Sequence, residues 1–317
     1  MSRSLVLLSG EGTTIPAAEA KSLFLAYDPE AKFSQPEKRV IIVDSKAEPR
    51  RVARRVAFAR RVGLLLGDPA DAFGLLKGKT VRLSAFRTTA SRPVVDPASL
   101  LRGLDRQVDL EDPDYEITLV DGEERYFALT IPREMVQGWR LRSPRRRAYF
   151  HPSAIFPKLS RALVNLTRCV EGQVLLDPFA GTGSILLEAA QAGMQPLAVD
   201  QTEAMSRGSL ANMKKFAQSW LGVVRADAFA LPFTRVDAIA TDAPYGRASS
   251  TRGRGAAPVV QRALERLPQV LNSGNRMVMM HPKDIPIQST ADLTVEEEHH
   301  LYVHKKLTRV ITILRKK

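Results

Sequence analysis

The segment LLDPFAGTGSILLEA, from Leu175 to Ala189, is the feature that most constrains the fold of this chain of 317 residues. It runs from an apolar strand through a glycine-rich turn into a helix, an order typical of the first βα unit of a ligand-binding α/β sheet. Gly181 and Gly183 carry no side chain, so the backbone of this turn can approach a ligand closely. We expect that ligand at the carboxyl ends of the strands.

From about Val174 onward, short apolar strands alternate with helices, which indicates repeated βα units and a mostly parallel sheet. The expected strands are Val174–Leu176, Leu197–Val199, Val223–Arg225, Ala238–Ala240 and Met277–Met280. The expected helices are Ser184–Ala192, Glu203–Trp220 and Val259–Leu271. Two further extended segments, Glu298–His304 and Leu307–Leu314, predict a closing antiparallel hairpin, which is the arrangement of Rossmann-like methyltransferases.

The first 140 or so residues lack this alternation and predict an α+β region of two small units. The expected strands there are Leu5–Leu8, Val40–Val43, Thr80–Ala85, Glu116–Val120 and Arg125–Thr130. A basic stretch around Ser143 and Pro144 is typical of an exposed connection, so we place the boundary between the two halves there.

The formal net charge of +13 and the isoelectric point of about 10.1 predict a polyanionic partner, because neutralised phosphates release their counterions. An apolar run of about 18 residues and a signal-type leader are both missing, so we expect no membrane partner and a cytoplasmic protein.

Cys169 is the only cysteine, which excludes an intramolecular disulfide and argues against a thiolate metal site. His299, His300 and His304 form an HHxxxH pattern, but they lie in an expected strand, where this spacing does not converge on one ion. We therefore predict that the protein binds no metal.

Three kinds of nucleotide ligand compete for the glycine-rich turn. A Walker A loop needs a Lys that does not follow Gly183, and a dinucleotide fingerprint needs a small residue where Leu186 stands. A pyrophosphate would gain little from the acidic Asp177, whereas the sulfonium and ammonium cations of S-adenosylmethionine would be attracted by it. S-adenosylmethionine is therefore the predicted cofactor.

Two later acids extend the expected cofactor site. Asp200 ends the next strand, where an acid can bind ribose hydroxyls, and Asp227 follows the third strand, where it can accept from the adenine amine. Ala228 and Phe229 would lie beside the ring. The candidate cofactor-binding residues are Asp177, Phe179, Ala180, Gly181, Thr182, Gly183, Asp200, Asp227 and Ala228.

The segment TDAPYG follows the fourth expected strand and predicts the place where a methyl group is received. An exocyclic nucleobase amine is a weak nucleophile, because its lone pair is delocalised into the ring. The Asp242 carboxylate and the Ala243 carbonyl could accept its two hydrogens, Pro244 would stiffen the backbone, and Tyr245 would stack on the base. These four are the candidate catalytic residues.

These motifs resemble those of the amino-methyltransferases with a [DN]PPY motif, and specifically of the archaeal tRNA guanine-10 N2-methyltransferases that carry a THUMP domain. DPFAGTGS and DAPYG carry the resemblance, together with Arg142 to Leu166, Val108 to Val120 and Leu301 to Leu314. One departure is that Ala243 replaces the first proline of the family's DPPYG. The backbone carbonyl remains, but the rigidity of the turn is put in question.

The resemblance implies a ferredoxin-like domain over residues 1–67, a THUMP domain over 68–142 and a methyltransferase domain over 143–317, with a linker at 143–157. It also implies a tRNA substrate that is recognised by shape and a paired guanine that is pulled out of its stem. The expected product is N2-methylguanosine or N2,N2-dimethylguanosine at position 10. The oligomeric state and any accessory subunit stay open.

Basic residues near the two halves' junction and after the DAPY motif are the candidate RNA contacts. They are Arg145, Arg146, Arg147, Arg247, Arg252 and Arg254, of which the last three lie in a loop that we expect to close over RNA.

The sequence leaves other activities open. The same chemistry fits another tRNA position, ribosomal RNA or the N6 amine of adenine. A catalytically silent RNA-binding protein is the alternative that Ala243 suggests, and an NAD-linked oxidoreductase is a third, although Leu186 and the lack of an evident acid-base histidine disfavour it.

Overall fold

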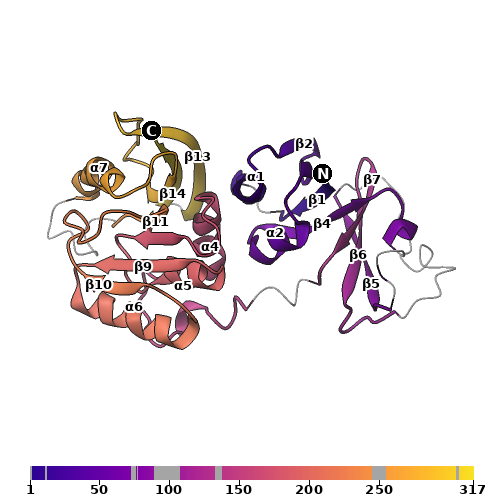
Figure 1. Cartoon of the computed structure of the whole chain (residues 1–317), viewed down its shortest axis with the longest axis horizontal. Coiled ribbons are helices and arrows are strands. Elements are labelled where there is room, and N and C mark those ends of the chain that lie inside the picture. Colours follow the sequence, from indigo (N-terminus) through magenta and orange to yellow (C-terminus); the bar gives the residue numbers. More distant parts are fainter. Residues whose placement is uncertain are drawn as a thin grey trace. The chain divides into compact units, whose positions relative to one another are not determined.

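The computed structural model describes residues 2–10, 13–72, 76, 78–88, 108–132, 138–244, 255–304 and 307–317. The chain forms two compact units, which are described separately. The N-terminal unit contains residues 1–12 and 16–137, and the C-terminal unit contains residues 13–15 and 138–317. Figure 1 shows a sheet in each unit. Within the described part of the chain, the helices are all too short or too polar to cross a membrane.

The N-terminal unit is built on one seven-stranded sheet in the order β2-β3-β1-β4-β7-β6-β5. Its strands are β1 (Ser2–Leu8), β2 (Lys32–Glu37), β3 (Val40–Ser45), β4 (Ala59–Leu66), β5 (Val81–Arg87), β6 (Tyr115–Asp121) and β7 (Arg125–Thr130). The helices are α1 (Ile15–Tyr27), α2 (Pro49–Arg55) and the short η1 (Pro69–Ala72). Only β5 and β6 pair in parallel among these strands. The α+β prediction is confirmed.

Two strands of this sheet were not predicted from the sequence. Strand β2 lies at the sheet edge and contains polar residues and a proline, which weaken a strand signal. Strand β4 is central but contains Gly63, whose missing side chain lets strand β7 approach: a Cβ there would lie 2.3 Å from the Leu129 carbonyl oxygen. Glycine, which usually marks a break, is here required by close strand pairing.

The strands on the two sides of residue 67 belong to this same sheet, since β4 pairs with both β1 and β7. The compact unit extends to Gln137. The predicted boundary at residue 67 would therefore divide one continuous sheet. The domains 1–67 and 68–142 remain a prediction.

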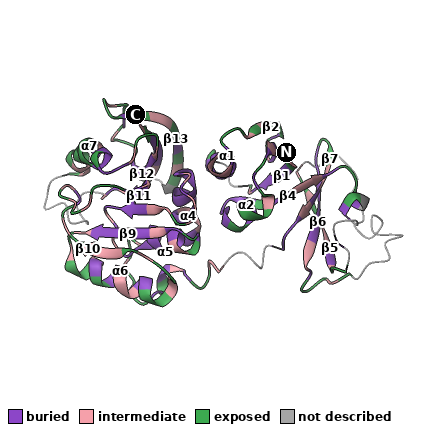
Figure 2. Ribbon diagram, in the orientation of Figure 1, coloured by how far each residue is buried: buried purple, intermediate pink, exposed green. Residues whose placement is uncertain are grey.

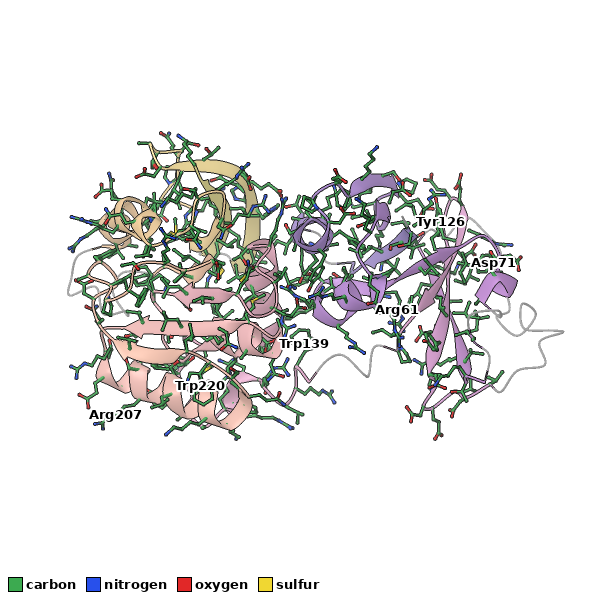
Figure 3. All side chains as sticks on the ribbon, in the orientation of Figure 1. Arg61, Asp71, Tyr126, Trp139, Arg207 and Trp220 are labelled. Atoms are coloured by element: carbon green, nitrogen blue, oxygen red, sulfur yellow. The ribbon has the colours of Figure 1, made fainter. Side chains whose placement is uncertain are left out.

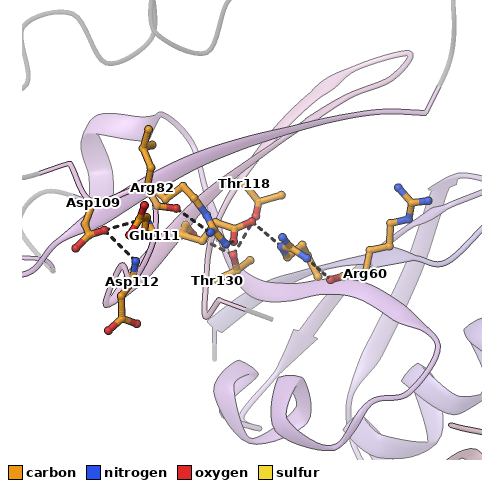
Figure 4. Close-up of polar contacts among 10 residues, drawn as sticks. Arg60, Arg82, Asp109, Glu111, Asp112, Thr118 and Thr130 are labelled. Carbon is orange, nitrogen blue, oxygen red and sulfur yellow. Dashed lines mark hydrogen bonds and ion pairs between the residues drawn. The ribbon is translucent and has the colours of Figure 1, made fainter. Parts of the chain in front are cut away.

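A buried carboxylate organises the second half of this sheet. Glu116 is fully buried and accepts from Arg61 at 2.6 Å and from Arg82 at 2.8 Å. Beside it, the hydroxyls of Thr118 and Thr130 lie 2.9 Å apart across β6 and β7 (Figure 4). The Glu116 carboxylate and the two threonine hydroxyls thus have partners, which offsets the cost of removing them from water.

The C-terminal unit has a second seven-stranded sheet, in the order β10-β9-β8-β11-β12-β14-β13. Its strands are β8 (Val174–Asp177), β9 (Gln195–Asp200), β10 (Gly222–Arg225), β11 (Ala238–Asp242), β12 (Arg276–Pro282), β13 (Leu293–His304) and β14 (Leu307–Lys316). The helices are α4 (Pro157–Leu166), α5 (Ser184–Gln191), α6 (Glu203–Phe216) and α7 (Ala256–Arg266), with the short turns η4 (Pro144–Arg146) and η6 (Leu267–Gln269).

The first five strands of this sheet are parallel, whereas β14 is antiparallel to both β12 and β13. The predicted parallel sheet with a closing hairpin is confirmed, and its strands begin or end within a few residues of the expected positions. Helix α5 ends before Gly193, whose φ of +81° fits the left-handed position after a helix. Helix α6 ends at Phe216, four residues before the expected end at Trp220.

Two apolar clusters surround the central strands, which Figure 2 colours as buried. Helix α7 contributes Val260 and Ala263 to one cluster, together with Ile239 and Met277 of the sheet. Helices α5 and α6 contribute Leu186, Leu187 and Met213 to the other. Burying a large apolar side chain stabilises a fold by about 1.5–3 kcal/mol, so these clusters hold the helices on the sheet.

The segment before helix α4 is clamped to helix α5 by a buried ion cluster. Glu188 of α5 is fully buried and accepts from Arg142 at 2.7 Å and from Arg161 of α4 at 3.0 Å. Both guanidinium groups also lie over the ring of Trp139, at 5.3 and 5.5 Å from its centroid. Trp139 is labelled in Figure 3. The prediction of an exposed connection is therefore wrong for Arg142, because its charge has a partner inside the fold.

Replacing Glu188 with Gln should lower the free energy of unfolding of the C-terminal unit by roughly 3 kcal/mol, because it leaves two buried guanidinium groups without their counter-charge. Both tryptophans of the chain, Trp139 and Trp220, lie in this unit, so their fluorescence in a denaturant titration reports its unfolding. Glu203→Gln is the control, since Glu203 pairs with Arg207 and Arg225 on the surface and should matter little. Equal effects of the two variants would contradict the role of the cluster.

Candidate active site

A cavity of about 840 Å³ opens at the carboxyl ends of the parallel strands of the C-terminal unit. The turn at Gly181, after β8, and the turn at Asp242, after β11, both line it. The sheet order reverses between these two neighbouring strands, and a crevice at such a reversal is the usual ligand site of open α/β sheets. The two motifs that the sequence singled out therefore share one site.

The glycine-rich turn has the conformation that its glycines predict. Gly181 and Gly183 have φ angles of +51° and +79°, in the left-handed region that disfavours other residues. A Cβ at Gly183 would also lie 2.6 Å from the Ser209 hydroxyl of helix α6. Helix α5 starts directly after Gly183, so the turn leads straight from the end of β8 into the helix.

Asp200 fixes this turn while it lines the cavity. One of its carboxylate oxygens accepts from the Gly181 amide at 2.9 Å, and the other accepts from the Thr202 amide at 2.8 Å. A carboxylate has about four acceptor sites, so these two bonds leave capacity for ligand hydroxyls. The residue thus both shapes the turn and remains able to bind a sugar.

Aromatic residues flank the next part of the cavity. Phe179 and Phe229 meet edge to face, with ring centroids 6.0 Å apart, and Ala228 is buried beside them. Asp227 accepts from the Phe229 amide at 3.0 Å. Arg262 of helix α7 lies 4.5 Å over the Phe229 ring and lines the same cavity. The sequence did not single out Arg262, because no motif surrounds it.

Asp177 is the most perturbed acid of the site. Burial raises the pKa of this carboxyl to about 7, and repulsion by Asp242 and Asp200 adds to the rise. Hydrogen bonds from the Thr241 hydroxyl, at 2.7 Å, and from the Phe179 amide, at 3.2 Å, act in the opposite direction. The group is therefore poised to ionise near neutral pH when a cation approaches it.

The DAPY turn lines the same cavity as the glycine-rich turn. Asp242, Ala243 and Pro244 line the cavity, while Tyr245 lies outside the described residues. The Ala243 amide donates to the Met280 carbonyl at 2.9 Å. A proline at this position has no N–H, so the bond is available only to a residue such as alanine. This hydrogen bond restrains the turn at Ala243, the position of the first proline in the DPPYG pattern that the motif resembles.

Two further parts of the lining were missed by sequence reasoning. Arg309 of β14 contacts Asp242, with 3.3 Å between Nη1 and Oδ2. The segment before α4 contributes His151, Ser153 and Ile155 to the wall. These three residues lie within Arg142 to Leu166, one of the segments that carry the family resemblance. That resemblance was the only sign in the sequence that the segment could lie near the site.

The predicted RNA-contacting arginines are not equivalent. Arg145 and Arg146 are exposed, but Arg147 is buried and donates to the Arg142 carbonyl, the Ile155 carbonyl and the Ser184 hydroxyl. Arg147 therefore does not offer its charge to RNA, because its donors are used inside the fold. Arg247, Arg252 and Arg254 lie outside the described residues. Among the described residues, no cluster of three or more His, Cys, Asp or Glu is placed to hold a metal ion.

The sheet, with its single antiparallel hairpin and its site at the strand reversal, is that of a Rossmann-like methyltransferase that uses S-adenosylmethionine. The chain belongs to the RMKL-like methyltransferase domain family, which matches residues 144–311.

Comparison with known proteins agrees with this assignment. The chain is 34% identical to the tRNA (guanine(10)-N2)-dimethyltransferase of Methanocaldococcus jannaschii over 223 residues, which cover 66% of this chain and 60% of that protein. It is 29% identical to the enzyme of the same name from Methanothermobacter thermautotrophicus over 98% of both chains. The crystal structure of TrmN from Thermus thermophilus matches 99% of this chain and 100% of its own, with a TM-score of 0.54 and 19% identity, which shows the fold.

The pKa of Asp177 predicts how cofactor binding depends on pH. The cationic cofactor favours the ionised carboxylate, so its affinity should rise as the pH rises through about 7. Binding should be roughly tenfold tighter at pH 8 than at pH 6 by proton linkage, as measured by calorimetry with S-adenosylmethionine. The Asp177→Asn variant should bind S-adenosylmethionine more weakly and lose this pH dependence. That loss would assign the pH dependence to Asp177 and not to His151, Asp200 or Asp242. Affinity that is flat or falling with pH would contradict the prediction.

Proposed function

We propose that this protein transfers methyl groups from S-adenosylmethionine to the N2 amine of guanosine at position 10 of tRNA, giving N2-methyl- and N2,N2-dimethylguanosine. The observation that carries the proposal is the meeting of the glycine-rich turn and the DAPY turn in one cavity. The names of the relatives from Methanocaldococcus and Methanothermobacter support the choice of nucleotide.

The residues around the cavity fit the parts of the cofactor. Asp177 lies where a carboxylate would attract its cationic end, and Asp200 keeps acceptor capacity for its ribose. Phe179, Ala228 and Phe229 offer apolar surface to the adenine, and Asp227 would accept from the adenine amine. The backbone at Ala180, Gly181 and Thr182 would lie close to the ligand, since these residues line the cavity. Gly183 does not line it, and its missing side chain makes room for Ser209 of helix α6.

Bound S-adenosylmethionine supplies a methyl group on a sulfonium, which an amine lone pair can attack. The Asp242 carboxylate and the Ala243 carbonyl would accept the two amine hydrogens and so localise the lone pair on nitrogen, while Pro244 limits the motion of the turn. Preorganised contacts of this kind are worth about 3 kcal/mol each, and alignment of the reacting atoms contributes roughly 7–11 kcal/mol. Positioning therefore outweighs proton removal in this reaction. Tyr245 would stack on the base.

The partner in this proposal is tRNA in the cytoplasm. The N-terminal unit would hold the tRNA by shape, and the guanine would be pulled from its stem before it enters the cavity. The positive charge of the chain favours such a polyanion. The hydrogen bond from the Ala243 amide to the Met280 carbonyl disfavours a catalytically silent protein. It restrains the turn whose rigidity the missing proline had put in question.

Mass-spectrometric mapping tests the proposal. Unmodified tRNA transcripts are incubated with the protein and S-adenosylmethionine, digested and sequenced. We expect one or two added methyl groups on guanosine 10 and none when that position is adenosine. Methylation of an adenine or of another position would reject the assignment, and tRNA that is bound but stays unmethylated would favour a silent RNA-binding protein.

Removing the proposed amine acceptor should greatly slow methyl transfer without loss of cofactor binding. Asp242→Ala should slow methyl transfer by about a hundredfold or more, because an acceptor aimed at the transition state is lost. Asp242→Asn keeps one acceptor oxygen and should lie between this variant and the wild type. Both should bind S-adenosylmethionine normally by calorimetry. Near-normal turnover of Asp242→Ala would remove Asp242 from its proposed role.

The two exposed junction arginines should contribute to tRNA affinity. Arg145→Ala combined with Arg146→Ala should weaken binding and reduce the slope of log affinity against log salt by about one to two, because each phosphate contact releases counterions. Filter binding at several salt concentrations measures this slope. Arg207→Ala, a change to another exposed arginine of the same unit, is the control. An unchanged slope in the double variant would argue against phosphate contact.

A further inference from the structure

The closing hairpin of the C-terminal sheet places a cation beside the proposed amine acceptor. Strand β11 ends at Asp242, its parallel neighbour β12 pairs Met280 with Asp242, and β14 pairs Arg309 with Pro282. Because β14 runs antiparallel, its first residues lie at the edge where the parallel strands end. A parallel strand in this place would bring its last residues to that edge instead.

Arg309 and Asp242 form an ion pair in the cavity wall. The Nη1 atom of Arg309 lies 3.3 Å from Oδ2 of Asp242 and 3.8 Å from the sulfur of Met280. The Arg309 side chain is 20% exposed and that of Asp242 is 16% exposed, so solvent screens the pair only partly. Both residues line the cavity.

The other charged groups of the cavity explain why a cation is needed here. Asp177 and Asp200 lie at the ends of β8 and β9, Asp227 also lines the cavity, and the charges of Asp177 and Asp242 repel each other. Arg262 of helix α7 lies over the Phe229 ring, and His151 lies in the segment before α4. Arg309, a cation of the described cavity lining, forms an ion pair with Asp242 at 3.3 Å. It therefore balances the acidic field at the DAPY turn.

We propose that Arg309 is a positioning residue for methyl transfer, which holds the Asp242 carboxylate in a fixed orientation at the edge where the amine enters. This proposal rests on the proposed function of Asp242. An acceptor that is already oriented does not have to be ordered during the reaction, so its contribution to the rate is larger. Arg309 acts through Asp242 and is not itself required to touch the base.

A double-mutant cycle tests this role. Arg309→Met keeps the stem of the side chain and removes its donors, and it should slow methyl transfer by about ten- to a hundredfold, the scale of a small misplacement of a reacting group. The KM for S-adenosylmethionine and the affinity for tRNA should stay unchanged. In an Asp242→Ala background, Arg309→Met should cause no further loss, because the group that it positions is absent. Arg309→Lys should restore part of the rate.

Control measurements separate positioning from folding. Arg315→Met changes an exposed arginine on the same strand and should leave the rate unchanged. Thermal melting and calorimetry with S-adenosylmethionine should show that the Arg309→Met protein is folded and binds its cofactor. A rate loss that is additive with Asp242→Ala, or that is matched by lost cofactor binding, would overturn the positioning role.

Failure of this inference can be told apart from failure of the proposed function. Wild-type protein that transfers no methyl group to tRNA would reject both. An active wild type, an inactive Asp242→Ala variant and a fully active Arg309→Met variant would reject only the role of Arg309.

Discussion

The hydrogen bond from the Thr241 hydroxyl to Asp177, at 2.7 Å, joins the two turns on which the site depends. Strands β8 and β11 pair only as far as Leu176 and Ile239, and the chains separate beyond that point to open the crevice. One residue further along β8, at Asp177, and two residues further along β11, at Thr241, this side-chain hydrogen bond takes the place of the backbone ladder. It keeps a buried acid at the base of the cavity and fixes the distance between the turn that approaches the cofactor and the turn that approaches the amine.

The parts of the site that the sequence predicted are those encoded within a few neighbouring residues. Gly181 and Gly183 need left-handed backbone, and the alternation of apolar strands and helices locates the sheet, so the glycine-rich turn and the DAPY turn could both be placed at the same edge. The closing hairpin was predictable for the same reason. The roles of the individual candidate residues remain predictions until they are tested by substitution.

The parts that the sequence did not predict depend on contacts between distant residues. Arg142 and Arg147 look like members of an exposed basic run, and only the position of Glu188 and Ser184 on helix α5 shows that they are buried. Arg309 is one arginine among many until the antiparallel strand brings it to Asp242. Gly63 looks like a strand breaker until the close approach of strand β7 is seen. In each case the partner lies too far along the chain for a local pattern to indicate it.

The bond from the Ala243 amide to the Met280 carbonyl has a consequence for engineering this turn. A proline ring restricts the unfolded chain as well as the folded one, whereas a hydrogen bond exists only in the folded state. Restoring the family's proline would thus exchange an enthalpic restraint for an entropic one and would leave a carbonyl of strand β12 to find another donor. The alanine and proline forms of this turn should therefore lose their geometry at different temperatures, even where the folded geometry is the same.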